Sequence, residues 1–272
     1  MTYFGFLGLF VAVPLLILAI LNWRVRHQPF PHRLSAFQPF GVVLAHVVVA
    51  LLYTTPWDNY LVATGVWWYE PVLVTGLTLG WIPIEEYTFF ILQTLLTGFW
   101  LIWLARKVVP TLGEFHPQKH LRWWSTLILA LFWLISVGIL LFGWHPGTYL
   151  ALILIWALPP IMVQTAFGAD ILWGYRSLVL PGFIIPTLYL SLADTLAIRS
   201  GTWTIDPAQS TGILFPGSLP VEEFLFFLVT NLLISFGITL VLARESQQRV
   251  SPHLLDRIMK VTRLQKPERT QL

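Results

Sequence analysis

The residues best suited to chemistry are two copies of one short block, which reads Pro-Ile-Glu-Glu at 83–86 and Pro-Val-Glu-Glu at 220–223. Apolar, Phe-rich sequence follows each block at once. A carboxyl that enters apolar surroundings beside a like charge favours its protonated form, and can then act as a general acid. A simple helix start is the alternative, because Pro and carboxylates both suit the first helical turn. Ionisable groups entering a membrane are costly enough that we favour a functional role.

Each Glu pair belongs to a longer repeat. Residues 58–71 align without a gap against residues 194–207, and the Glu blocks follow after one extra residue in the second copy. Of the 13 acidic residues, those in the repeat are Asp58, Glu70, Glu85, Glu86, Asp194, Asp206, Glu222 and Glu223. Such self-similarity at matching places indicates a duplicated structural unit.

The composition places this repeat in a membrane. Of the 272 residues, 56% are hydrophobic and 11% are charged, whereas a soluble domain carries roughly 25% charged residues. Seven stretches reach the roughly 17–25 mostly apolar residues that a spanning helix needs. They lie near 3–22, 38–55, 83–104, 124–143, 148–168, 173–193 and 220–243. We therefore predict an all-α integral membrane protein.

The repeat and the spans together predict the domain organisation. Residues 1–105 form a first three-helix repeat, and residues 148–243 form a second. Residues 106–147 supply a basic loop and a linker helix, which gives both repeats the same orientation. Parallel repeats related by an axis along the membrane normal would bring the two motifs together. Residues 244–272 form a basic tail.

The basic residues predict the orientation. Arg199 is the one basic residue on the motif side of a seven-helix count, and the other Lys and Arg of the 16 lie on the opposite side. Because Lys and Arg concentrate in cytoplasmic loops, we expect the N-terminus outside and the C-terminus in the cytoplasm, in the cell membrane. Basic residues beside spans indicate contact with lipid and give no support to nucleic-acid binding.

Aromatic residues surround the motifs and suit an apolar substrate cavity, although an interfacial aromatic belt is the alternative. They are Trp67, Trp68, Trp81, Phe89, Phe90, Trp203, Phe226 and Phe227. With no cysteine, no dinucleotide or phosphate-binding loop and no clustered metal ligands, redox and prenyl-transfer chemistry lose support, and we expect no metal site. A retinal photoreceptor is excluded because residues 220–243 contain no lysine.

The paired Pro-x-Glu-Glu blocks, the stretch at 57–67 and the seven-helix layout resemble the fused form of the heterodimer-type carotenoid lycopene cyclases. The resemblance covers nearly all of residues 1–243 and implies acid-catalysed closure of the ψ ends of lycopene to β rings, without a cofactor. It implies Glu85 and Glu222 as the acids, with Glu86 and Glu223 assisting them or accepting the departing proton. Asp58, Asp194, Glu70 and Asp206 would support them.

Several alternatives stay open at this level. The same resemblance extends to cyclases of C50 carotenoids and to carotenoid hydratases. A proton-coupled transporter also suits parallel repeats with carboxyls in the membrane. Asp58 and Asp194 would equally serve as helix caps. Neither the acid member of each Glu pair nor the oligomeric state follows from the sequence.

Overall fold

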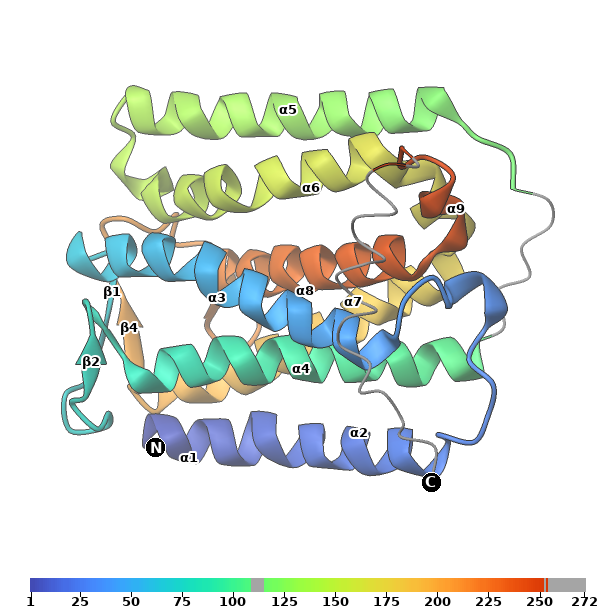
Figure 1. Ribbon diagram of the computed structural model, residues 1–272. Helices are drawn as coiled ribbons and strands as arrows, with labels where there is room; N and C mark the ends of the chain where they lie inside the picture. Colours follow the sequence, from blue (N-terminus) through green and yellow to red (C-terminus); the bar gives the residue numbers. More distant parts are fainter. Residues whose placement is uncertain (109–114, 252, 254–272) are drawn as a thin grey trace.

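The computed structural model describes residues 1–108, 115–251 and 253, and within them seven helices are long and apolar enough to cross a membrane. They lie side by side in one bundle (Figure 1). The first span comprises α1 (Tyr3–Phe6), a π-helical segment (Leu7–Ala12) and α2 (Val13–Arg24). The others are α3 (Pro39–Ala63), α4 (Ile84–Lys107), α5 (Lys119–Leu141), α6 (Thr148–Gly174), α7 (Arg176–Arg199) and α8 (Val221–Leu242). The predicted all-α membrane fold is confirmed.

Helices α3 and α7 extend beyond their predicted ends at matching places of the two repeats, and α6 continues past residue 168 to Gly174. We expected α3 to end near residue 55, but it continues through Pro56 to Ala63, and α7 continues to Arg199. Both extensions carry an aspartate, Asp58 or Asp194, that lowers the local hydropathy. A backbone in apolar surroundings must satisfy its own hydrogen bonds, so the helices persist where the side chains become polar.

The two helices that begin with the Glu pairs occupy the centre of the bundle. In α4 and α8, 61% of the most apolar window is buried, against 6% in α5. Helix α5 packs chiefly on α6, at the edge of the bundle (Figure 1). This peripheral place fits a linker between repeats, and the exact domain boundaries stay a prediction.

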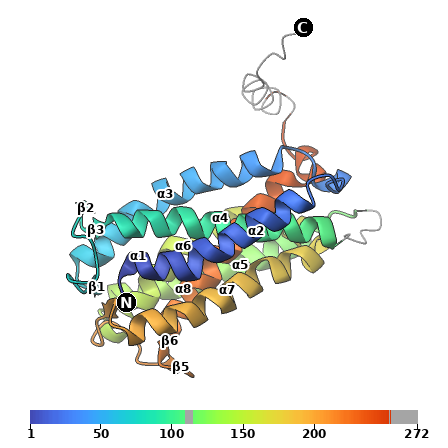
Figure 2. The same cartoon turned by 90° about the horizontal axis from the view of Figure 1, so that it is seen from below.

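Short strands, which the sequence analysis did not predict, cover one end of the bundle. Strand β1 (Trp67–Tyr69) pairs antiparallel with β4 (Trp203–Ile205), so that Tyr69 lies opposite Trp203. Two small hairpins, β2 (Thr78–Leu79) with β3 (Ile82–Pro83) and β5 (Leu214–Phe215) with β6 (Leu219–Pro220), lead directly into α4 and α8. The strands and the N-terminus share this end in both views (Figures 1 and 2). We call it the strand end.

Matching contacts join the two halves of the chain. The Tyr53 hydroxyl donates to the Trp156 carbonyl at 2.8 Å, and the Tyr189 hydroxyl donates to the Phe10 carbonyl at 2.9 Å. The two tyrosines occupy matching places in the two halves, since Tyr53 precedes Asp58 by as many residues as Tyr189 precedes Asp194. These contacts support the predicted duplication.

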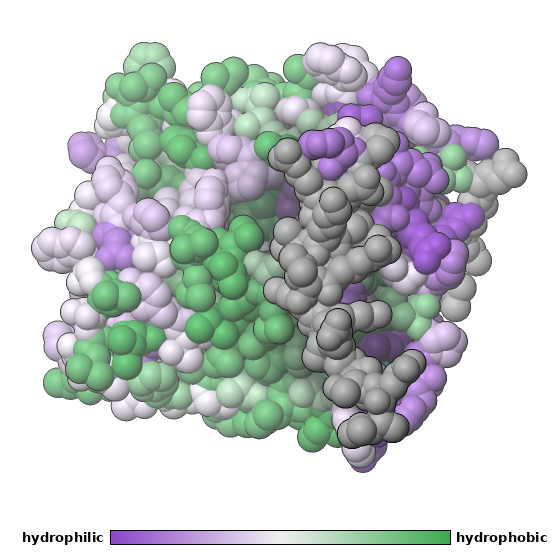
Figure 3. All heavy atoms as spheres, in the orientation of Figure 1, coloured by the Kyte–Doolittle hydropathy of each residue, from purple (hydrophilic) through white to green (hydrophobic). Residues whose placement is uncertain are grey.

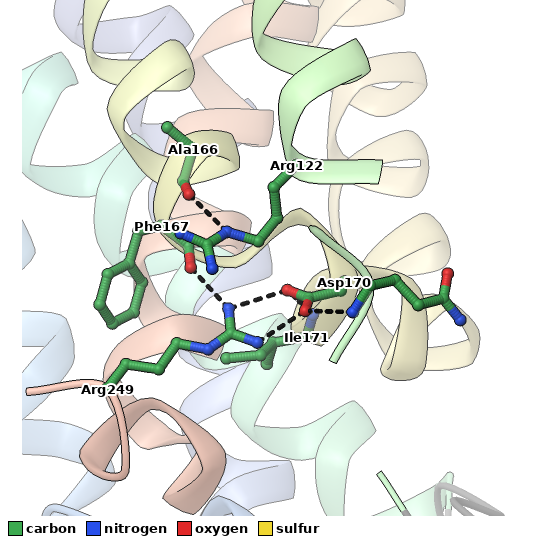
Figure 4. Close-up of polar contacts among 7 residues, drawn as sticks. Arg122, Ala166, Phe167, Asp170, Ile171 and Arg249 are labelled. Carbon is green, nitrogen blue, oxygen red and sulfur yellow. Dashed lines mark hydrogen bonds and ion pairs between the residues drawn. The ribbon is translucent and has the colours of Figure 1, made fainter. Parts of the chain in front are cut away.

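The opposite end, which we call the tail end, is hydrophilic (Figure 3). It holds the turns His32–Leu34 and α9 (Arg244–Gln247), whereas the turn His145–Gly147 lies at the strand end between α5 and α6. At the tail end, Arg249 binds both carboxylate oxygens of Asp170, at 2.8 and 2.6 Å, and also donates to the Phe167 carbonyl (Figure 4). Asp170 also accepts from the Gln118 amide, so it ties three segments together. Residues 252 and 254–272 of the predicted tail lie outside the described residues.

The Asp170 ion pair predicts a local contribution to stability. The Arg249→Gln variant should lower the free energy of unfolding by about 1.5–3 kcal/mol, because it removes charge-assisted hydrogen bonds to a buried carboxylate. Denaturant unfolding of the purified protein in detergent measures this difference. The matched control is Arg176→Gln, since Arg176 is exposed and contacts Trp173 nearby. Equal effects of the two substitutions would contradict the assignment.

Candidate functional site

A small cavity lies beneath the β1–β4 strand pair, between the starts of α4 and α8. Its volume is about 20 Å³, which holds roughly one water molecule. Residues from both halves of the chain line it, so the matching motifs meet in one place. The meeting of the motifs at one end of the bundle agrees with the sequence-based expectation.

Four carboxyl groups face this cavity: Asp58 of α3, Glu86 of α4, Asp194 of α7 and Glu223 of α8. None is more than 3% exposed. Both aspartates lie inside their helices rather than at N-caps, so the capping alternative is wrong for them. The described residues offer Asp58 no hydrogen bond of normal geometry, and Trp203 is the side chain that approaches Asp194. The cavity therefore gathers four buried carboxyl groups from both halves of the chain.

Buried tyrosines orient the two cavity glutamates. Tyr3 and Tyr69 both donate to Oε2 of Glu86, at 2.5 and 3.0 Å, and Tyr149 donates to Oε1 of Glu223 at 2.7 Å. Burial, and then the nearby Glu86 carboxyl, raise the pKa of Tyr69 well above its ordinary value of 10.0, so its phenol stays a donor. The phenols thus fix each carboxyl at the cavity wall.

The first glutamate of each pair points elsewhere. Glu85 accepts the Thr75 amide at 2.6 Å, and Glu222 accepts both the amide and the hydroxyl of Thr211 at 2.7 Å. Both side chains are buried, yet neither lines the cavity. Residues at successive helical positions point about 100° apart, which separates the two members of each pair. Glu85 and Glu222 anchor the loops that precede α4 and α8.

The remaining predicted residues divide into two groups. Six of the aromatics line the cavity: Trp67, Phe89, Phe90, Trp203, Phe226 and Phe227. Trp68 and Trp81 are 44% and 66% exposed, which matches the alternative of an interfacial belt. Glu70 is exposed, and Asp206 binds Gln209 and the Ala208 amide in a turn, which lowers the pKa of Asp206. The structure does not bring Glu70 or Asp206 to the cavity.

Five further residues, which line the cavity or bind one of its carboxyl groups, were not anticipated from the sequence. They are Tyr3, Phe6, Trp57, Tyr69 and Tyr149. One signal was available, since Tyr3 and Tyr149 each stand close to the start of the first span of their repeat. The aligned motifs begin far downstream of both tyrosines, so aligning the motifs did not reveal that Tyr3 and Tyr149 correspond.

The fold and the site define an integral membrane protein with one enclosed, aromatic-lined carboxyl cavity. The chain is 40% identical to a lycopene beta-cyclase of Halobacterium salinarum over 248 residues, which cover 89% of this chain and 98% of that protein. It is therefore a member of the lycopene cyclase family.

More distant relatives carry an additional activity in their names. A bifunctional lycopene cyclase/phytoene synthase of Phaeosphaeria nodorum is 38% identical over 222 residues, which cover 78% of this chain and 37% of that protein. The corresponding protein of Aspergillus oryzae is 37% identical over 230 residues, with coverages of 83% and 37%. No family model and no solved structure matches the chain.

The loop-anchoring role of Glu85 predicts different effects of two substitutions. Glu85→Ala should remove the carboxylate acceptor of the Thr75 amide and reduce the protection of residues 70–83 by about 0.5–1.5 kcal/mol. Glu85→Gln retains a carbonyl oxygen at the same place and should preserve most of that protection. Amide hydrogen exchange in detergent measures this protection in both variants. Equal exchange in the alanine variant and the unsubstituted protein would refute the anchoring role.

Proposed function

We propose that this enzyme closes the ψ ends of lycopene into β rings in carotenoid biosynthesis, converting lycopene to γ-carotene and then to β-carotene. The observation that carries the proposal is the cavity in which Glu86 and Glu223 meet among aromatic rings. The similar protein of Halobacterium salinarum is named a lycopene beta-cyclase, which supports the same reaction. Its similarity favours this reaction over transport, hydration or C50 cyclisation.

The chemistry is an isomerisation that begins and ends with a proton. A carboxylic acid protonates C2 of the terminal double bond, which leaves a cation at C1. The C5–C6 double bond attacks C1, so a C1–C6 bond forms and the cation moves to C5. Loss of the C6 proton to a carboxylate yields the β ring, whereas loss from C4 would yield an ε ring. No atom is gained or lost overall.

We assign the acid role to Glu86 and Glu223, in place of the Glu85 and Glu222 that the resemblance first suggested. The reason is access, because Glu86 and Glu223 line the cavity while their neighbours bind loop amides. Asp58 and Asp194 face the same space and suit the acceptance of the departing proton. Aromatic faces around a cation each contribute about 0.5–2 kcal/mol. Phe89, Phe227 and their neighbours would supply them.

A single cavity has a consequence for the order of reaction. Since both glutamates line the same small space, the two ends of lycopene react there one after the other. The aromatic rings of the lining would close round a bound end group and leave little room for water beside it. Capture of the cation by water, which a hydratase needs, is therefore disfavoured.

Substitution of either cavity glutamate tests the assignment. Glu86→Gln and Glu223→Gln should each lower the rate of lycopene consumption by about 10²–10⁴-fold, because each removes a group that carries the proton. The measurement is chromatographic analysis of pigments in membranes of a lycopene-accumulating bacterial host, at matched protein levels.

Glu85→Gln and Glu222→Gln serve as matched controls, since the amide oxygen still accepts from the loops. Losses confined to these two controls, with Glu86→Gln fully active, would return the acid role to the first member of each pair. Unchanged lycopene with the folded, unsubstituted protein would refute lycopene cyclisation itself.

We further propose that the strand end faces outward and the tail end faces the cytoplasm of the cell membrane. The distribution of Lys and Arg supports this orientation. Because the chain contains no cysteine, single thiols can be placed without background. A membrane-impermeant maleimide on intact cells should label Leu77→Cys at the strand end and spare Ser251→Cys at the tail end. The reverse pattern would invert the topology.

A further inference from the structure

A second, larger cavity adjoins the acid cavity between α3, α4, α6 and α8. Its volume is about 230 Å³, and we call it the membrane groove. Phe90 and Phe226 line both cavities, so two aromatic rings stand between them. Phe226 also stacks on Trp57, at 5.9 Å between ring centroids, and Trp57 stacks on Trp156 of the groove at 4.4 Å. The groove therefore adjoins the proposed acid site, with the Phe90 and Phe226 rings between them.

The groove runs along the helix axes, away from the strand end. On α3 it extends from Thr54 to His46, which is about 12 Å at 1.5 Å per residue. Asp58 of the acid cavity lies one turn beyond Thr54 on the same helix. The groove therefore begins where the acid cavity ends and continues into the apolar thickness of the bundle.

Three of the polar side chains of the groove make hydrogen bonds within the protein, although Gln164 Oε1 has no partner among the described residues. Gln93 donates to Thr230 at 3.0 Å, Gln164 donates to the Leu233 carbonyl at 3.0 Å, and the His46 ring contacts the Val42 carbonyl at 2.8 Å. These groups leave a largely apolar surface for a guest. A guest without polar groups suits such a lining.

The two halves pack differently at the place of His46. Gly182 holds the place in α7 that His46 holds in α3, as judged from its spacing to Asp194. A Cβ atom at Gly182 would lie 2.5 Å from Leu101, because α4 packs directly against this position. This close packing at the matching place favours an approach to both acids from the α3 side.

We propose that the membrane groove holds the conjugated chain of the carotenoid while its ψ end lies in the acid cavity, with Phe90 and Phe226 moving to admit that end. This inference rests on the proposed function. A conjugated chain is straight, apolar and narrow, which matches the elongated, largely apolar groove. The acid cavity holds about one water molecule as it stands, so an end group enters it only when the two rings move, and the rest of the chain must lie outside it.

Adjacent valines on α3 provide the test. Val49 lines the groove and Val48 does not, although they are 61% and 55% exposed. Val49→Trp, and Ala50→Trp deeper in the groove, should each lower lycopene turnover about tenfold or more, and Val48→Trp should not. The same three substitutions in the Glu86→Gln background report bound lycopene by absorbance of the purified protein. There the two groove variants should retain about tenfold less lycopene.

The two readouts separate the possible failures. Wild-type turnover and wild-type lycopene content in both Val49→Trp and Ala50→Trp would overturn the groove. If Ala50→Trp lowers the melting temperature sharply, Val49→Trp alone decides. Lycopene bound by the unsubstituted chain but left unconverted, with binding lost in the groove variants, would refute the proposed reaction and support the groove.

Discussion

The burial of four carboxyl groups in one apolar cavity is the constraint on which the rest of the structure depends. Removing an ionised carboxylate from water costs several kcal/mol, and like charges at close quarters add to that cost. The protein offsets it with the Tyr3, Tyr69 and Tyr149 phenols and with the starts of α4 and α8. Long helices beneath the cavity and the β1–β4 pair above it keep this arrangement enclosed.

Duplication explains how such an arrangement is built from a short motif. Each half of the chain contributes one aspartate, one cavity glutamate and one phenol from the start of its first span. The first glutamate of each pair holds the loop that covers its own half. Beyond the cavity the halves diverge, since His46 and Gly182 occupy matching places with different packing. In the function proposed above, the duplicated part would serve proton transfer, and the unequal part would determine how an apolar molecule approaches.

Much of this fold follows from hydropathy and from the repeat, because the bilayer admits few ways to satisfy a backbone. Both the seven spans and the meeting of the two motifs could be predicted in this way. The sequence does not reveal which of Glu85 and Glu86 faces the cavity, because that depends on the rotation of α4 within the bundle. The contacts of Tyr3 with Glu86 and of Tyr69 with Trp203 join distant segments without a local pattern. Strands of two or three residues likewise carry too little periodicity to predict.

The most direct test of the central claim is an experimental structure of the Glu86→Gln variant in a lipid nanodisc with lycopene bound. We expect one ψ end between residue 86 and Glu223, with the Phe89 and Phe227 rings against it. An end group beside Glu85 or Glu222, or two end groups in separate sites of one chain, would refute a shared acid cavity.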